Sequence, residues 1–138
     1  MKKEPRGIRN NNPLNIRKGN NWQGERQPQT DVEFEEFESM QYGVRAAFKI
    51  LKNYLTGYGG KRPKCNTIEK IVKRWAPETE NATQSYINSV CRTTGLNRYE
   101  VIRFEDRKKM VAIVDAMIRV ECGKPIDTDI IESAYDML

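Results

Sequence analysis

From Ser39 onward, apolar residues recur every three or four positions, which is the spacing that places them on one face of a helix. The clearest run extends from Ser39 to Gly57 and contains Tyr42, Val44, Ala46, Ala47, Phe48, Ile50, Leu51, Tyr54 and Leu55. Runs of the same spacing predict four further helices: one from Thr67 to Trp75, one capped by Asn81 or Thr83 and ending near Gly95, one from Asp106 to Glu121 and Gly123, and one capped by Asp127 or Thr128. The chain after residue 39 is therefore predicted to be helical.

The first 38 residues have a different pattern. Residues 1–13 are basic and rich in asparagine and end in Asn-Pro, which favours an extended or turn conformation, and we expect residues 1–10 to form a flexible arm. LNIRKGNNWQGE places short β-compatible pieces around Gly19-Asn20-Asn21, and TDVEFEEF is compatible with one more short strand. The predicted fold class is therefore α+β, mainly α. It is a single domain over residues 1–138 with a small N-terminal antiparallel β-hairpin sheet.

Length and composition are typical of one globular domain. The chain has 138 residues, of which 38% are hydrophobic and 31% charged. It contains no apolar run of the roughly 20 residues needed to cross a bilayer. Because no hydrophobic segment follows the basic start MKKEPRGIRNNNP, we expect no secretory signal and synthesis in the cytoplasm.

The residue types restrict the chemistry. The chain has no histidine, which excludes Ser-His and Cys-His nucleophiles and leaves acid/base chemistry to carboxylates, tyrosine or lysine. Its three cysteines lack CxxC spacing, so we interpret them as reduced packing residues and expect neither a metal nor a cofactor. The net charge of +5 indicates a polyanionic partner, either nucleic acid or the bacterial cell wall. Lysine and arginine are scattered rather than clustered, which favours the wall.

One acidic residue stands out in the stretch AMIRVECGKP. Glu121 shares a helix face with the apolar Val114, Met117 and Ile118, and it lies at the helix C-terminus, two residues before Gly123. Burial and the negative end of the helix dipole both raise the pKa of a carboxyl group. A carboxylic acid that stays protonated near neutral pH is what general-acid cleavage of a glycosidic bond requires. The alternative is a helix-end glutamate that reaches into water.

Three stretches, taken in order, resemble a known enzyme family. NNNPLNIRKGNNWQGE, FEEFESMQYGVRAAFKIL and RWAPETENATQSYINSVCRTTGL are similar to the glucosaminidase family of cell-wall hydrolases, in which an N-L-F-G-I-K…W-x-G hairpin precedes F-R-x-Y-x-S and Y-A-T-D-P-x-Y. The chain also resembles, nearly end to end, small phage virion and prophage proteins that open with G-I-R-N-N-N-P-x-N-I-R. The resemblance implies a lysozyme-like domain that cleaves peptidoglycan glycan strands by hydrolysis or lytic transglycosylation.

The catalytic glutamate of that family is absent from its usual place. It lies in an L-E-S-G segment upstream of the hairpin, whereas here only a short polar stretch precedes Asn11. IRVECG near the other end resembles the I-x-x-E-S-G segment of lytic transglycosylases and glucosaminidases. Our hypothesis is a circularly permuted domain in which Glu121 supplies the acid, since domain termini often lie close together.

Two further residues are catalytic candidates, one implied by the resemblance and one chosen from the chemistry of glycosidases. Tyr86 matches the tyrosine of D-P-x-Y, which helps to position substrate or a proton; its alternative role is packing in the core. A second carboxylate serves as base or nucleophile in many glycosidases. Asp31 is our candidate, although the acids of VEFEEFE are also compatible with a solvated strand face.

The resemblance also implies substrate-binding candidates. Asn15 is expected to bind an N-acetyl group and Trp22 to stack on a sugar ring, with a turn hydrogen bond and hairpin packing as their respective alternatives. Gln23, beside Trp22, and Asn81, in the segment that contains Tyr86, complete the set.

The expected partners are peptidoglycan strands together with virion or secretion-apparatus proteins, and we expect a monomer. An enzyme made without a signal peptide would reach the wall through a virion, a holin-like pore or a secretion system. Two other functions stay open. One is a catalytically silent phage structural or glycan-binding protein of the same fold, and the other is a nucleic-acid-binding module, suggested only by the charge.

Overall fold

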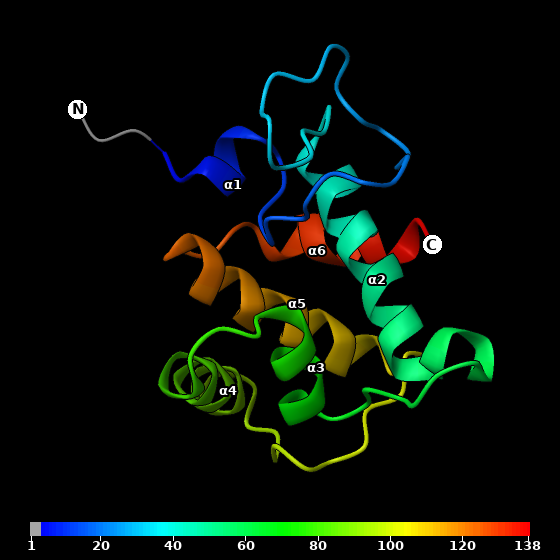
Figure 1. The fold of residues 1–138 in the computed structure, drawn as a ribbon, viewed down its shortest axis with the longest axis vertical. Coiled ribbons are helices and arrows are strands. Elements are labelled where there is room, and N and C mark those ends of the chain that lie inside the picture. Colours follow the sequence, from blue (N-terminus) through cyan, green and yellow to red (C-terminus); the bar gives the residue numbers. More distant parts are fainter. Residues whose placement is uncertain (1–3) are drawn as a thin grey trace.

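The computed structural model describes residues 4–138, and these residues form six α-helices (Figure 1). The helices are α1 (Arg6–Arg9), α2 (Met40–Gly60), α3 (Ile68–Trp75), α4 (Glu80–Thr94), α5 (Arg107–Cys122) and α6 (Thr128–Asp136). Helix α5 contacts α1, α4 and α6, while α2 packs on α6 and α3 packs on α4. Within the part of the chain that the structure describes, no helix is long and apolar enough to cross a membrane.

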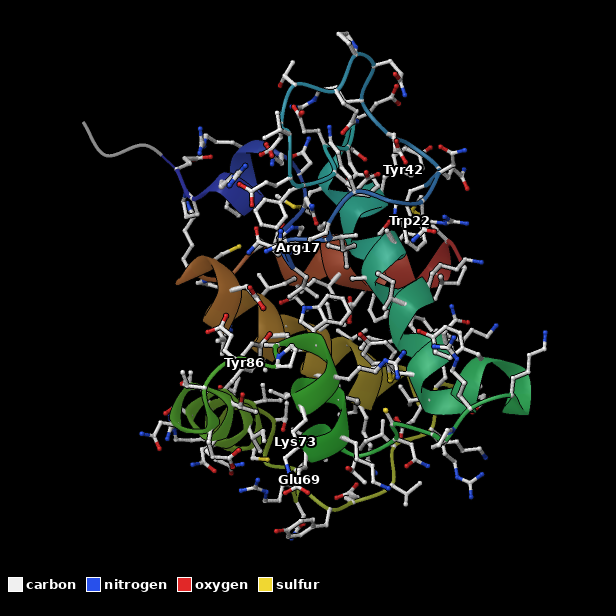
Figure 2. All side chains as sticks on the ribbon, in the orientation of Figure 1. Arg17, Trp22, Tyr42, Glu69, Lys73 and Tyr86 are labelled. Carbon is white, nitrogen blue, oxygen red and sulfur yellow. The ribbon has the colours of Figure 1, made fainter. Side chains whose placement is uncertain are left out.

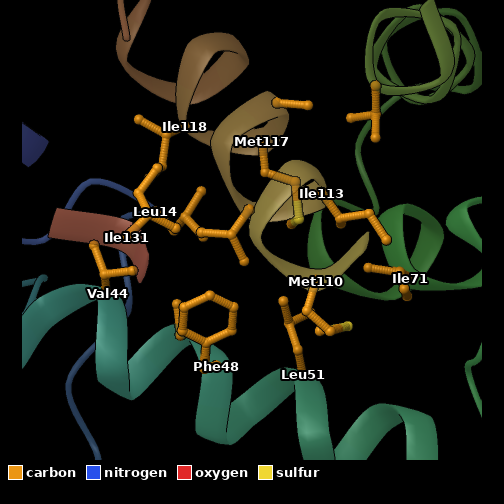
Figure 3. Packing of buried hydrophobic residues seen from close by; sticks show 14 of the residues in the cluster. Leu14, Val44, Phe48, Leu51, Ile71, Met110, Ile113, Met117, Ile118 and Ile131 are labelled. Atoms are coloured by element: carbon orange, nitrogen blue, oxygen red, sulfur yellow. The ribbon is translucent and has the colours of Figure 1, made fainter. Parts of the chain in front are cut away.

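The hydrophobic core lies where α2, α5 and α6 meet. Phe48 of α2, Met110 and Met117 of α5, and Ile131 of α6 are fully buried, and Figure 3 shows their side chains converging from the three helices. Burying one such side chain stabilises the fold by about 1.5 to 3 kcal/mol. These residues lie on the apolar faces that the sequence predicts, which confirms the helical part of the prediction.

Most of the predicted helix ends are confirmed. The side chains of Thr67, Asp106 and Asp127 each accept a hydrogen bond from a backbone N–H in the first turn of α3, α5 and α6. Gly95 and Gly123 end α4 and α5 with φ of 74°, in the left-handed region that favours glycine.

The start of α4 differs from the prediction. Its cap is Thr79, whose hydroxyl oxygen accepts a hydrogen bond from the N–H of Ala82, rather than Asn81 or Thr83. Asn81 falls in the first turn, and the hydroxyl of the buried Thr83 donates to the carbonyl of Ala76. The helix therefore begins directly after the short connection from α3.

Residues 10–39, here called the N-terminal segment, contain no β-sheet, and the predicted α+β class is wrong. The structure has two isolated antiparallel bridges in this segment, Arg17 with Phe34 and Glu25 with Phe37. Both arms of the expected hairpin therefore pair with the third extended piece instead of with each other. The fold over residues 4–138 is helical with an irregular N-terminal segment.

Polar side chains explain why a sheet does not form. The buried amide of Asn12 donates to the carbonyls of Ile16 and Glu35 and accepts from the N–H of Ile16. The carboxylate of Glu36 accepts hydrogen bonds from the backbone N–H groups of Thr30 and Asp31. These side chains bond backbone groups that a continuous strand ladder would otherwise pair.

The expected N-terminal arm, residues 1–10, is only partly covered, because residues 1–3 lie outside the described residues. Residues Arg6–Arg9 form the single turn of α1. The guanidinium group of Arg6 donates two hydrogen bonds of 2.6 Å to the carboxylate of Asp31. This turn is thereby joined to the N-terminal segment.

Candidate active site

Glu121 is the penultimate residue of α5, and its side chain is half-buried. Asn15 Nδ2 donates a hydrogen bond of 3.1 Å to Glu121 Oε1, and the hydroxyl of Tyr86 donates one of 3.1 Å to Glu121 Oε2. Each oxygen of the carboxyl group therefore has one fixed donor. Because each oxygen also keeps a second lone pair, the group can carry a proton while both contacts persist.

A tight turn in the N-terminal segment brings Asn15 to the end of α5. Asn15 has a φ of 54°, a left-handed conformation that asparagine tolerates better than most residues, and its N–H donates to the carbonyl of Asn12. Beside it, the buried thiol of Cys122 donates to the carbonyl of Pro13 at 3.2 Å. Two parts of the chain more than one hundred residues apart are thus in contact at Glu121.

Tyr86 reaches the same carboxyl group from α4, which packs against α5. Its side chain is buried apart from a small exposed fraction. Burial and the neighbouring Glu121 carboxylate raise the pKa of the Tyr86 hydroxyl far above its usual range. The hydroxyl therefore stays protonated and acts as a donor.

A pocket of about 480 Å³ opens beside this cluster. It is lined by Ala76, Glu78, Ala82, Ser85, Tyr86, Ser89, Val120 and Glu121. Three of these residues, Ala82, Ser85 and Ser89, recur at helical spacing along one face of α4, and their small side chains leave the space above Glu121 open. The volume lies in the range of pockets that hold small ligands.

The electrostatics of the pocket favour a protonated Glu121. Burial raises the pKa of the Glu121 carboxyl, and the charge of Glu78 raises it further. The hydrogen bonds from Asn15 and Tyr86 act in the opposite direction because they stabilise the ionised form. The net shift is upward, as a general acid requires.

Comparison with known proteins gives one informative relative. Over 136 residues, the chain is 40% identical to Protein P5 of Pseudoalteromonas phage PM2, in an alignment that covers 95% of this chain and 80% of that protein. The chain belongs to the Protein P5 family. No protein-family model matches the sequence. The expected link to phage proteins is confirmed at the level of this family, whereas the assignment to lysozyme-like enzymes stays a prediction.

In this member of the Protein P5 family, Asp31 does not reach the pocket. Its carboxylate is bonded to Arg6 and also accepts a hydrogen bond of 2.9 Å from Asn10 Nδ2. The Arg6 guanidinium, together with backbone and Asn10 donors, holds the pKa of Asp31 far below its usual range. Asp31 therefore has a structural role in the N-terminal segment.

Trp22 lies in a second pocket, of about 790 Å³, which is also lined by Tyr54, Tyr58 and Arg74. Figure 2 shows Trp22 beside α2, well away from Tyr86. The glycine of the W-x-G stretch, Gly24, lies against the ring of Tyr42, where an added Cβ atom would collide. Trp22 is thus separate from the pocket of Glu121.

The two remaining substrate-binding candidates are exposed. Gln23 follows Trp22 on the surface, and Asn81 lies in the first turn of α4, next to the pocket residue Ala82. Neither lines the pocket of Glu121 or the pocket of Trp22. Of the seven predicted residues, the structure therefore brings together Glu121, Tyr86 and Asn15.

Glu78 and Ser89 line the pocket but are absent from the sequence prediction. Ser89 follows Ala82 and Ser85 at helical spacing, so the face of α4 that carries Tyr86 contains a usable signal. Glu78 lies in the connection between α3 and α4, where no periodic pattern applies. The one available signal is its place within RWAPETENATQSY, the stretch that resembles the hydrolase family.

Proposed function

We propose that this chain cleaves the glycan strands of peptidoglycan and that Glu121 protonates the glycosidic oxygen. The observation that carries the proposal is the carboxyl group of Glu121, half-buried at the end of α5, held by Asn15 and Tyr86 and open to a pocket. Burial raises its pKa, so a larger share of the group carries the proton that a general acid donates.

Asn15 and Tyr86 act as positioning residues in this scheme. Each holds one oxygen of Glu121 and thereby restricts the rotation of its carboxyl group. A fixed acid loses less entropy when it approaches the glycosidic oxygen than a freely rotating one. The contacts of Pro13 and Asn15 with the end of α5 also agree with the permutation hypothesis, which requires the segment that resembles the hairpin to adjoin the acid.

The experiment is the release of soluble fragments from purified peptidoglycan, analysed by mass. The native chain should release muropeptides, and Glu121→Gln should be slower by about 100-fold or more because the amide cannot donate the proton. Glu105→Gln is the matched control, since Glu105 is exposed and lies outside the pocket. Circular dichroism and thermal unfolding establish that all three proteins fold alike.

Equal cutting by the native chain and Glu121→Gln would contradict the role of Glu121. If neither protein cuts, the alternative of a silent phage protein is favoured. Sedimentation with insoluble peptidoglycan then separates a glycan-binding protein, which is retained, from a structural protein without affinity for the wall.

The place of action belongs to the same proposal. An enzyme of this kind acts on the wall after delivery by a phage particle, a holin-like pore or a secretion system. The membership in a phage protein family supports the first two routes.

A further inference from the structure

We propose that Glu78 is the second catalytic carboxylate, a base that activates water, and that the reaction is therefore hydrolysis with inversion at the anomeric carbon. The inference rests on the proposed cleavage of peptidoglycan and goes beyond it. Glu78 takes the role of second carboxylate that was predicted for Asp31 from the sequence. A base that activates water also favours hydrolysis over lytic transglycosylation, which uses no external water.

The first observation is that Glu78 and Glu121 face one space from different parts of the fold. Glu121 is in the last turn of α5, while Glu78 belongs to the connection between α3 and α4. Both line the same pocket of about 480 Å³. The charge of Glu78 acts on the carboxyl group of Glu121, although no hydrogen bond joins them. A ligand in this pocket would lie against both groups.

The second observation is that Glu78 is available. Its side chain is exposed and makes no hydrogen bond or ion pair with any residue in the range 4–138. Its backbone is nevertheless fixed, because its N–H donates to the carbonyl of Ala76 at 2.8 Å and Thr79 directly after it caps α4. A carboxylate that has no hydrogen bond within the described chain, on a backbone held in place, is suited to contact substrate or water.

The third observation is that the two carboxyl groups have different surroundings. Glu121 is half-buried and receives two hydrogen bonds, whereas Glu78 is open to solvent. In such pairs the surroundings assign the roles, so the half-buried carboxyl group is the acid and the solvent-exposed one is the base. Asp31 does not compete for the second role, because Arg6 and Asn10 occupy its carboxylate.

Each glutamate transfers one proton in the proposed hydrolysis. Glu121 gives its proton to the glycosidic oxygen as the bond from that oxygen to the anomeric carbon breaks. Water attacks the anomeric carbon from the opposite face, and Glu78 takes the proton that this water loses. The products are two sugar ends, one with a free hydroxyl and one a hemiacetal, and proton exchange with solvent restores both glutamates.

The first test examines the products of the native chain. Digestion in water labelled with ¹⁸O should place one ¹⁸O atom at each new reducing end. Proton NMR recorded during the reaction should first show the anomer opposite to that of the cleaved bond. Products with 1,6-anhydro ends, or first products that keep the original anomer, would overturn the inference while leaving the cleavage proposal intact.

The second test removes the base. Glu78→Gln should reduce hydrolysis by about 100-fold to 10,000-fold, the usual contribution of a general base. Glu80→Gln is the matched control, because Glu80 is exposed two residues away, lies outside the pocket and bonds only Gln84 through its side chain in the described chain. Equal rates for the native chain and Glu78→Gln overturn the role of Glu78.

A third measurement is independent of activity. If Glu78 faces Glu121 as inferred, removing its charge in Glu78→Gln should lower the pKa of Glu121, followed by ¹³C NMR of the carboxyl carbons. An unchanged pKa shows that the two groups do not share the pocket and overturns the inference. A native chain that cuts no peptidoglycan overturns the cleavage proposal and this inference with it, whereas a native chain that cuts as fast as Glu78→Gln overturns this inference alone.

Discussion

The helical body, residues 40–138, and the N-terminal segment, residues 10–39, are held together by different interactions. In the body, side chains such as Phe48, Ile113 and Met117 are fully buried among other apolar groups. In the segment, the buried groups include the polar Asn12, Glu35 and Glu36. Apolar contacts are non-directional and tolerate small adjustments, whereas each hydrogen bond needs its particular partner. The conformation of the segment therefore depends on the identity of individual polar residues.

The two regions meet at the candidate active site. Asn15 and Pro13 of the segment contact Glu121 and Cys122 at the end of α5, and α4 contributes Tyr86 from the other side. The body supplies the acid and the segment supplies one of the two donors that hold it. Changes in either region should therefore reach the site, but with different effects on the stability of the whole protein.

The largest expected effect comes from the core of the body. Phe48 is fully buried and packs edge-on against Tyr135 at 5.4 Å between ring centroids. Phe48→Ala should lower the free energy of unfolding by about 3 to 5 kcal/mol, measured by urea titration, because it removes apolar contacts and leaves a cavity. Val32→Ala, at a residue that is 86% exposed in the segment, should change it by less than about 0.5 kcal/mol. Similar losses for the two variants would contradict the comparison.

The next effect is a pH dependence that arises in the segment. Glu35 is 3% exposed, and burial together with the nearby Glu25 carboxyl raises its pKa from 4.5 to about 7. Between these two pH values the folded chain holds a proton that the unfolded chain has lost. The stability is therefore fully present below about pH 4.5, falls as the pH rises toward 7, and changes no further above it. The loss is on the order of 3 kcal/mol, since one unit of pKa corresponds to about 1.4 kcal/mol.

Glu35→Gln tests this dependence. A neutral amide has no proton to lose, so the variant should be more stable than the native chain at pH 8, with a weaker fall between pH 4.5 and 7. The matched control is Glu38→Gln, which removes an exposed carboxylate from the same segment. Thermal unfolding at a series of pH values provides the measurement. A native slope retained in Glu35→Gln would show that another group causes the fall.

The helices could be predicted because their information is local and periodic. Ile68, Ile71 and Val72 recur at helical spacing in α3, and Thr67 before them is a recognisable cap. In the N-terminal segment, the hydrogen bonds that determine the conformation join residues at no regular spacing along the sequence. Asn12 bonds the carbonyl of Glu35, 23 residues further along the chain, and nothing in the alternation of apolar and polar residues indicates that contact. The hairpin was predicted from the turn residues Gly19-Asn20-Asn21, but the two pieces on either side of them do not pair with each other.

A smaller and more local loss is expected when the segment loses Asn12. The side chain of this residue is fully buried and bonds both the N–H and the carbonyl of Ile16. Asn12→Ala should lower the free energy of unfolding by about 1 to 3 kcal/mol, because the N–H of Ile16 is left buried without a partner. Hydrogen exchange should become faster in the N-terminal segment, while amides of α2 and α5 keep their protection. Asn88→Ala, at an exposed residue of α4, is the control, and a uniform increase along the chain would contradict the local effect.

The site was predictable only where family motifs or helix periodicity fixed a position. Glu121 followed from its place on the apolar face of a helix that ends at Gly123, and Tyr86 and Asn15 followed from the resemblance. The structure brings these three together, and their catalytic roles stay predictions. Asp31 could not be excluded from the sequence, because its partner Arg6 lies 25 residues away. Glu78 could not be found from the sequence, because the neighbours of this loop residue are set by the packing of α3, α4 and α5.

The smallest expected effect concerns the contact that joins the two regions. Asn15 donates to Glu121 and thereby lowers the pKa of its carboxyl group, opposing the effect of burial. Asn15→Gly removes the amide and keeps the left-handed φ of 54° accessible, so the turn should persist. The pKa of Glu121 should rise, and the alkaline limb of the rate of peptidoglycan cleavage, where the acid loses its proton, should move to higher pH.

Asn15→Ala distinguishes this electrostatic effect from a loss of the turn. Alanine also removes the amide but disfavours the left-handed conformation by about 1 kcal/mol, so this variant should combine the same pKa rise with a small loss of stability. Carboxyl ¹³C titration of Glu121 measures the pKa in both variants, whatever the rate of cleavage. A pKa that falls in Asn15→Gly would mean that removal of the amide lets water reach Glu121. Hydration of the site, rather than the donor from the N-terminal segment, would then control the acid.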